Sequence, residues 1–155
     1  MNAPHINWQI AQLDQLSPQQ LYAMFGLRQR VFVVEQACAY ADIDAHDECA
    51  THILAWVDEE LVAVARLIAP GEVFSGPTIG RVLVSPAWRR QGLGVQLMRF
   101  AMALAETRYP KMSIELAAQC AQHVWYQRLG FEVAGEVYVE DGIPHINMQQ
   151  KQRCE

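Results

Sequence analysis

The chain has 155 residues, with 17 acidic and 12 basic side chains and hence a formal net charge of −5. Hydrophobic residues make up 52% of the chain and charged residues 19%, a composition typical of a globular protein and unlike that of a disordered chain. The acidic balance argues against nucleic acid as a partner, because binding phosphates requires clustered Lys and Arg. We therefore expect a single globular domain over residues 1–155.

Features that mark membrane or exported proteins are absent from the sequence. The longest strongly apolar stretch, residues 61–69, is interrupted by Arg66 and is shorter than the roughly 18 residues of a membrane span. The N-terminal residues lack the basic and apolar regions of an export signal, so we expect a cytoplasmic protein. The four cysteines are widely spaced, form no CxxC pair and are expected to be reduced thiols: Cys38, Cys49, Cys120 and Cys154.

Strand and helix signals alternate along the first half of the chain. Apolar and polar residues alternate at 6–10, as in a half-buried strand. Ser17, Pro18 and Gln20 form a capping box with proline at the first helical position, which predicts a helix start. In chain order we expect a strand at 6–10, a helix after Ser17, an irregular acidic loop at 36–50, and strands at 52–57, 61–68 and 78–84.

The second half continues the alternation. Apolar residues at helical spacing follow Gly92 and Gly94, and this helix is expected to end before Pro110. The remaining elements are a strand at 112–118, a helix at 121–129 ended by Gly130, and strands at 131–139 and 143–148 joined by the Asp141-Gly142 turn. This order predicts an α/β fold, a single-domain mixed, mostly antiparallel sheet flanked by helices.

The turn between the strand at 78–84 and the following helix carries a signal for anion binding. A helix N-terminus exposes unpaired backbone N–H groups and a partial positive charge, which favour phosphate. Arg89 and Arg90 add positive charge, and we expect Gly92 and Gly94 to remove Cβ atoms that would collide with a diphosphate. A P-loop is excluded because no Lys-Ser or Lys-Thr follows, and a dinucleotide fingerprint because Leu97 stands at the third glycine position.

Two motifs in this region resemble those of the GNAT family of N-acetyltransferases. Residues 89–94 read RxxGxG, the family's loop for the pyrophosphate of acetyl-CoA, and residues 126–131 read YxxxGF. Their order and distance also agree with the family pattern. VFVVEQ at 31–36, DIDAHD at 42–47 and EDGIPHINM at 140–148 further resemble the ElaA-like branch, so the resemblance spans nearly the whole chain.

The resemblance implies a GNAT-like acyl-CoA N-acyltransferase fold and transfer of acetyl from acetyl-CoA to a primary amine. It identifies Tyr126 as the candidate general acid that protonates the departing thiolate. It also implies cofactor contacts from the strand, the turn and the helix start: Val82, Leu83, Val84, Arg89, Arg90, Gln91, Gly92, Leu93, Gly94 and Val95. The chain departs from the family pattern at Gln119, where Asn is frequent, at Gln122, where a small residue is frequent, and at Arg90, where glycine is common.

The general base is left open by the sequence, because no carboxylate lies within the strand at 78–84. Proximity to the thioester cannot be deduced from sequence, and a base must lie within reach of the proton it removes. Arg66 either pairs with a carboxylate near the cleft or points to solvent. The base candidates are Glu35, Glu115, His52 and His145.

Three further expectations concern ligands and partners. His46, Cys49 and His52 recur every three residues, but structural zinc usually takes four ligands from two paired clusters, so we expect no metal. The acidic segment has two interpretations: it attracts a cationic amine as the acceptor, or it is a solvated loop without substrate contact. Its acidic residues are Asp42, Asp44, Asp47 and Glu48. The alternative to catalysis is a noncatalytic acyl-CoA-binding module, and the chain is expected to be a monomer or a homodimer.

Overall fold

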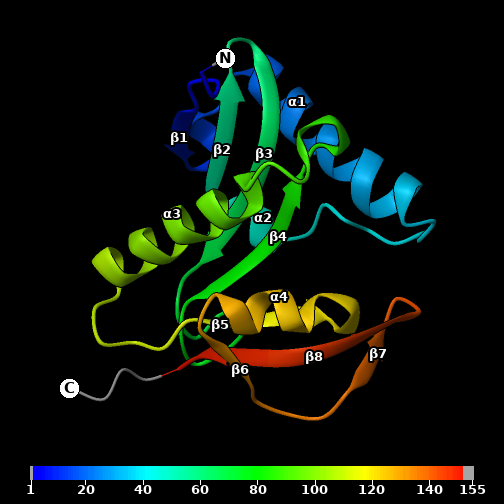
Figure 1. The fold of residues 1–155 in the computed structure, drawn as a ribbon, viewed down its shortest axis with the longest axis vertical. Coiled ribbons are helices and arrows are strands. Elements are labelled where there is room, and N and C mark those ends of the chain that lie inside the picture. Colours follow the sequence, from blue (N-terminus) through cyan, green and yellow to red (C-terminus); the bar gives the residue numbers. More distant parts are fainter. Residues whose placement is uncertain (1, 152–155) are drawn as a thin grey trace.

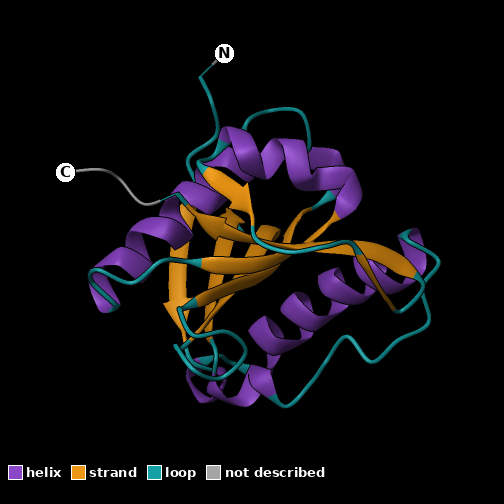
Figure 2. Ribbon diagram, turned by 90° about the horizontal axis from the view of Figure 1, so that it is seen from below, coloured by secondary structure: helices purple, strands orange, loops and turns teal. Residues whose placement is uncertain are grey.

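The computed structural model describes residues 2–151 and contains an eight-stranded sheet with helices on both faces (Figures 1 and 2). Cys154 lies outside the described residues, and the other three cysteines are free thiols. No helix within residues 2–151 is long and apolar enough to span a bilayer. The strands are β1 (Asn7–Ala11), β2 (Thr51–Val57), β3 (Glu60–Ile68), β4 (Thr78–Val84), β5 (Glu115–Gln119), β6 (Phe131–Val133), β7 (Tyr138–Glu140) and β8 (Ile143–Gln150).

The strand order is β1-β2-β3-β4-β5-β8-β6, with β7 also paired to β8. All pairs are antiparallel except β4 and β5, which run parallel and share one register pair, Thr78 with Glu115. Beyond that pair the two strands diverge, so the sheet is split into two parts that are visible in Figure 1. The mixed, mostly antiparallel sheet expected from the sequence is confirmed.

Helices cover the two faces of the sheet and create two cores. On one face, α3 buries Leu97 and Met98 against apolar residues of β2, β3 and β4. On the other, α1 buries Met24 and Leu27 against Leu54. The helical segments are η1 (Leu13–Gln15), α1 (Pro18–Arg28), η2 (Gln29–Glu35), α2 (His46–Cys49), η3 (Pro86–Trp88), α3 (Leu93–Arg108), η4 (Cys120–Gln122) and α4 (His123–Arg128).

The start of α1 is the capping box expected from the sequence. Ser17 Oγ accepts from the Gln20 N–H at 3.1 Å, and the Gln20 side chain accepts from the Ser17 N–H at 2.9 Å. Helix α1 then continues directly into η2, a π-helical segment whose Val31 and Phe32 are buried. This extension, which was not predicted, carries the chain over the split in the sheet.

The strand predicted at 131–139 is wrong as a single element. Val133 pairs with Met148, and Tyr138 pairs with His145, so the four residues 134–137 lie opposite only two residues of β8, 146 and 147. The extra residues bulge out between β6 and β7 around Gly135, a residue that does not favour regular strand structure. The strand predicted at 112–118 begins later, at Glu115.

Candidate active site

A cleft of about 920 Å³ lies where β4 and β5 separate. Val82, Leu83 and Val84 line one wall, and Ala117 and Gln119 line the other. Antiparallel pairing occupies the β3 edge of β4, but within residues 2–151 the opposite edge has no strand partner beyond Thr78. Backbone groups of the cleft-facing edge are therefore available to a ligand.

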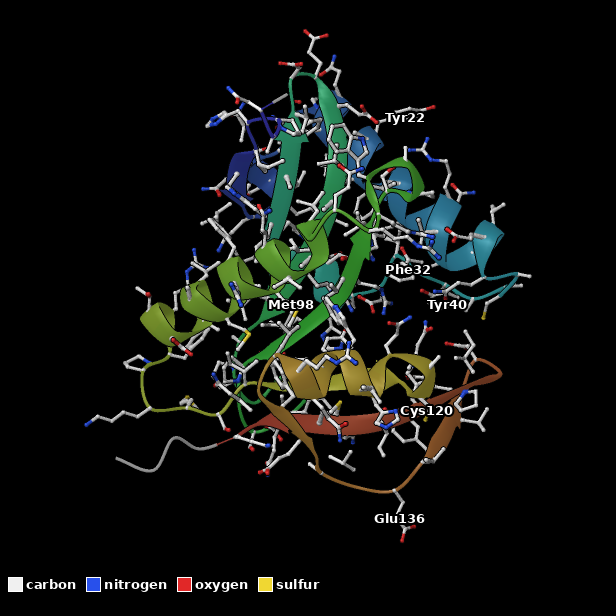
Figure 3. The ribbon with its side chains drawn as sticks, in the orientation of Figure 1. Tyr22, Phe32, Tyr40, Met98, Cys120 and Glu136 are labelled. Carbon is white, nitrogen blue, oxygen red and sulfur yellow. The ribbon has the colours of Figure 1, made fainter. Side chains whose placement is uncertain are left out.

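Side chains from distant parts of the chain surround this cleft. In Figure 3, Phe32 and Tyr40 lie on its upper side and Cys120 on its lower side. Phe32 and Tyr40 line the cleft. Gln119 and Gln122, which lie near Cys120 in the sequence, also line it. These two glutamines are two of the three departures from the family pattern, and Gln119 Nε2 donates to Gln36 Oε1 across the cleft at 3.0 Å.

The glycine turn places the N-terminus of α3 at the cleft. The N-cap, Gly92, has a left-handed backbone with φ of +79°, and no side chain caps the helix. The first bond of the helix runs from the Gln96 N–H to the Gly92 carbonyl, so the N–H groups of Leu93, Gly94 and Val95 have no intrahelical acceptor. All of these residues except Gln96 line the cleft. This donor set fits an anionic group such as a diphosphate.

The two glycines of the turn have different roles. A Cβ on Gly92 would meet nothing within 4 Å, which leaves open space in front of the helix. A Cβ on Gly94 would lie 3.2 Å from Cζ2 of Trp125 on α4. A side chain at Gly94 would therefore press on Trp125, so this glycine favours close packing of α3 against α4. Diphosphate access, which was expected of both glycines, stays a prediction, and the open space in front of Gly92 is consistent with it.

The basic and amide residues of the turn are also distinguished by the structure. Arg89 and Arg90 line the cleft, but Gln91 does not. Arg90 stands where the family commonly has glycine, and its φ of +62° is the conformation that glycine adopts at low cost. Gln91 Nε2 donates to the Ala87 carbonyl at 3.5 Å, so the side chain is directed back along the turn.

Tyr126 projects from α4 into the same cleft. Its ring makes edge contacts with Trp125 and Phe131, at centroid distances of 4.9 and 6.2 Å. Burial raises the pKa of Tyr126 to about 12, because the phenolate would lose its hydration. The hydroxyl is therefore protonated at neutral pH, as a proton donor must be.

The four base candidates occupy very different environments. Glu115 accepts hydrogen bonds from the Gly76 N–H at 2.7 Å and the Ser75 hydroxyl at 3.2 Å, and it does not line the cleft. His52 is also outside the lining, with Nε2 at 2.9 Å from the Asp47 carbonyl oxygen. Glu35 and His145 line the cleft.

Glu35 and His145 differ in what already binds them. Both carboxylate oxygens of Glu35 accept hydrogen bonds from Arg89, and this contact holds the pKa of Glu35 below its usual value. His145 Nδ1 lies 2.7 Å from the Ile143 carbonyl oxygen, which can only accept a hydrogen bond. In the neutral ring the proton is then on Nδ1, and Nε2 carries the free lone pair.

The acidic segment is not the free anionic surface that the sequence suggested. Arg28 donates through Nε to Asp42 at 2.8 Å and through Nη1 to Asp47 at 2.6 Å. Arg66 bridges Asp44 and Asp47 at 2.7 and 3.0 Å. The expectation that three of these carboxylates attract a cationic acceptor is therefore wrong, because each is paired inside the protein. Glu48 is exposed.

Arg81 completes this charge cluster, whose six members are Arg28, Arg66, Arg81, Asp42, Asp44 and Asp47. Arg66 thus pairs with carboxylates, one of the two alternatives that its sequence position left open. Arg28 and Arg81 were missed because their partners are distant in sequence. The pairing holds the pKa of Asp44 below its usual value and that of Asp47 at about 2, against the opposing effect of burial.

The three metal-ligand candidates do not come together. His46 lines the cleft, Cys49 is exposed, and the His52 ring nitrogen is bonded to the backbone. Within the described residues no group of three or more His, Cys, Asp or Glu side chains is arranged to hold a metal ion.

Comparison with known proteins agrees with this geometry. Residues 12–152 match the family model described as Acetyltransferase (GNAT) domain. The Escherichia coli protein ElaA is 43% identical over 148 residues, which are 94% of this chain and 97% of ElaA.

Solved structures extend the likeness to three dimensions. The crystal structure of Escherichia coli ElaA superposes with a TM-score of 0.88 at 42% identity, covering 95% of this chain and all of the other. An acyl-CoA N-acyltransferase from Pseudomonas aeruginosa superposes with a TM-score of 0.89 at 40% identity and the same coverage. At 17% identity, an Elizabethkingia anophelis GNAT family acetyltransferase with acetyl-CoA bound shares the fold, with a TM-score of 0.69 and coverage of 95% and 98%.

The family assignment follows from the whole chain and not from one motif. The matched range, residues 12–152, contains the uncapped turn before α3, the diverging strands β4 and β5, and the tyrosine on α4. The chain belongs to the GNAT family of acyl-CoA-dependent acyltransferases, in its ElaA-like branch.

Proposed function

We propose that this chain transfers the acetyl group of acetyl-CoA directly to a primary amine. The observation that carries the proposal is that one cleft joins the uncapped N-terminus of α3, the free edge of β4, Tyr126 and His145. Acetyl-CoA as the donor is further supported by the Elizabethkingia anophelis family member of the same fold, which has that molecule bound. We also propose that residues 1–155 act as one domain, as a monomer or a homodimer.

The binding part of the site uses backbone groups. The free N–H groups of Leu93, Gly94 and Val95 hold the diphosphate, and the open space at Gly92 lets it approach. The free edge of β4 at Val82 to Val84 aligns the extended pantetheine arm, and an N–H there polarises the carbonyl oxygen. Acetyl-CoA supplies the activated thioester when bound.

The chemical part needs one base and one acid. His145 Nε2 takes a proton from the acceptor ammonium, either directly or through water, because Nδ1 is occupied by the Ile143 carbonyl. The amine lone pair then forms the new C–N bond as the C–S bond breaks. Tyr126 donates its hydroxyl proton to the departing sulfur, a role suited to a phenol with a pKa of about 12. The new amide nitrogen then loses its second proton, which returns to the Tyr126 oxygen directly or through water.

The test separates an enzyme from a noncatalytic acyl-CoA-binding module. The purified chain is mixed with acetyl-CoA and a panel of primary amines, and both free thiol and N-acetylated product are measured. Thermal shifts with acetyl-CoA, CoA and NADH are recorded in parallel, since a ligand that binds the folded state raises its melting temperature. We expect shifts with the first two only, and product with at least one amine. A shift without product for any amine would indicate the binding module.

A further inference from the structure

Three buried side-chain atoms in residues 2–151 have no hydrogen-bond partner within the protein, and all belong to residues that line the cleft. They are Arg66 Nε, Thr78 Oγ1 and Arg81 Nε. Arg81 Nε lies 2.9 Å from Asp42 Oδ1 but does not direct its N–H at that oxygen. The carboxylate therefore compensates the charge of Arg81 without accepting this hydrogen bond. Arg66 Nε and Thr78 Oγ1 are the two donors left without any such contact. Leaving a buried donor unpaired is costly, which points to a partner supplied from the cleft.

Arg66 is a rigidly held donor. It is only 5% exposed, and its Nη1 and Nη2 atoms donate to Asp44 and Asp47 over 2.7 to 3.0 Å. These bonds fix the guanidinium plane, and Nε is its one nitrogen without a hydrogen-bond partner among the described residues. Because a guanidinium has no acceptor atom, the missing partner must accept a hydrogen bond.

The register of β3 and β4 places Thr78 diagonally across from Arg66. Arg66 pairs with Gly80, and Thr78 lies two residues before Gly80, so both side chains rise from the same face of the sheet. Thr78 is 6% exposed. A Cβ on Gly80 would meet nothing within 4 Å, so open space lies above this position on β4, and all three residues line the cleft. Arg66, Thr78 and Gly80 together form what we call the oxygen subsite.

The charge of the surroundings is balanced. Three arginines and three aspartates make up the adjoining cluster, so it offers no net attraction to an ammonium group. The unpaired groups of the oxygen subsite are a charged N–H and a hydroxyl, which match the oxygens of a carboxylate. The cation-binding surface expected from the acidic segment is thus replaced by a site for hydrogen-bond acceptors.

We propose that the oxygen subsite binds the carboxylate of the acceptor, so that the acceptor is a small amino acid with its amine directed toward the thioester. This inference rests on the proposed function, because it names the second substrate of the same cleft. It also distinguishes the acceptor from polyamines and simple alkylamines, which have no oxygen to pair with Arg66 and Thr78.

The test compares straight-chain ω-amino acids of increasing length with alkylamines that have the same number of methylene groups. We expect kcat/KM to favour the amino acid at one chain length by at least about tenfold, as for a lost hydrogen bond to a charged group. Thr78→Val should remove most of that preference, and Thr78→Ser should restore it. Since the Thr78 hydroxyl is unpaired in the free protein, Thr78→Val should not lower the melting temperature.

A second measurement keeps this inference separate from the proposed function. The preferred ω-amino acid is titrated calorimetrically into the complex of the protein with CoA, which cannot react. Binding that is lost in Thr78→Val and kept in Thr78→Ser supports the oxygen subsite even if no amine is acetylated. Equal acetylation of amino acids and alkylamines by wild type and Thr78→Val would overturn the subsite and leave the acetyltransferase proposal intact. Absence of calorimetric binding would overturn it as well.

Discussion

Arg89 and Glu35, 54 positions apart in the sequence, form a paired ion bridge over the cleft. Arg89 Nη2 donates to Glu35 Oε2 at 2.8 Å, Nη1 donates to the second oxygen, and Nε donates to the Val84 carbonyl at 3.1 Å. The bridge joins the end of η2 to the turn that precedes α3. A residue expected to hold phosphate is therefore engaged by a residue that was a base candidate.

This bridge leads to a prediction for Glu35→Gln. Removing the carboxylate leaves the Arg89 charge uncompensated beside the anion site, so CoA should bind about threefold to fivefold more tightly at low salt. Isothermal titration calorimetry at two salt concentrations measures the effect, which should shrink as salt rises. Glu48→Gln, at an exposed acidic position, is the control. Weaker CoA binding in Glu35→Gln would show that the bridge instead organises the turn.

Gly92→Glu should abolish the thermal shift caused by CoA. The substitution places a negative charge in the open space at the N-terminus of α3, where the diphosphate is proposed to bind. It also introduces strain of about 1 kcal/mol, because φ is +79°. Gly92→Asn is the control, since asparagine tolerates the left-handed conformation and adds no charge. An undiminished shift in folded Gly92→Glu would exclude the proposed diphosphate site.

Tyr126→Phe should lower kcat and leave the binding of CoA nearly unchanged. The variant removes the proton donor but keeps the ring that contacts Trp125 and Phe131. General acid catalysis contributes about a hundredfold or more, so a decrease of that size is expected where chemistry limits turnover. Steady-state kinetics and calorimetry are the measurements. A wild-type kcat would assign Tyr126 to packing alone.

His145→Gln should also reduce turnover without affecting the thermal shift by CoA. The glutamine cannot supply the free ring nitrogen that the Nδ1 contact with Ile143 leaves at Nε2. His123→Gln is a matched control, because His123 Nδ1 also contacts a backbone carbonyl oxygen, that of Cys120, at 2.8 Å, and the residue is outside the cleft lining. Equal rates for the two variants would remove His145 from the proposed mechanism.

The stability of the protein should fall in two stages as the pH is lowered. Burial holds the pKa of His52 below its unfolded value of 6.5, so the unfolded chain takes up a proton first and stability decreases below about pH 6.5. The slope of the free energy of unfolding against pH approaches about 1.4 kcal/mol per pH unit when the two states differ by one bound proton. Below the unfolded value of 3.8, Asp44 and Asp47 add a steeper decrease, continuing toward the Asp47 pKa of about 2.

His52→Gln separates these two stages. Glutamine retains an N–H donor for the Asp47 carbonyl but has no group that titrates in this range. Urea unfolding at a series of pH values should therefore lose the decrease in stability that begins near pH 6.5 and keep the one that begins near pH 3.8. A variant with the wild-type slope near pH 6 would assign that stage to other groups.

The sequence by itself predicted the elements whose signals are local. The capping box at Ser17, the strand at 78–84 and the glycine turn before α3 depend on residues within a few positions of each other. Local backbone chemistry decides such features, so tertiary contacts do not change them. The family resemblance also rests on short motifs, and the residues of both motifs other than Gln91 include several that line the cleft, among them Gly92 and Tyr126.

Only the tertiary structure decided which side chains meet across the cleft. Arg28 and Asp47 are 19 positions apart, and Arg81 and Asp42 are 39 apart, so no periodicity links them. The acidic segment is irregular, and its carboxylates could equally have faced solvent. Folding buries them against arginines because an unpaired buried charge is too costly. That pairing removed the expected cation surface, and the β3–β4 register placed Thr78 and Arg66 on one face of the sheet with donors still unpaired.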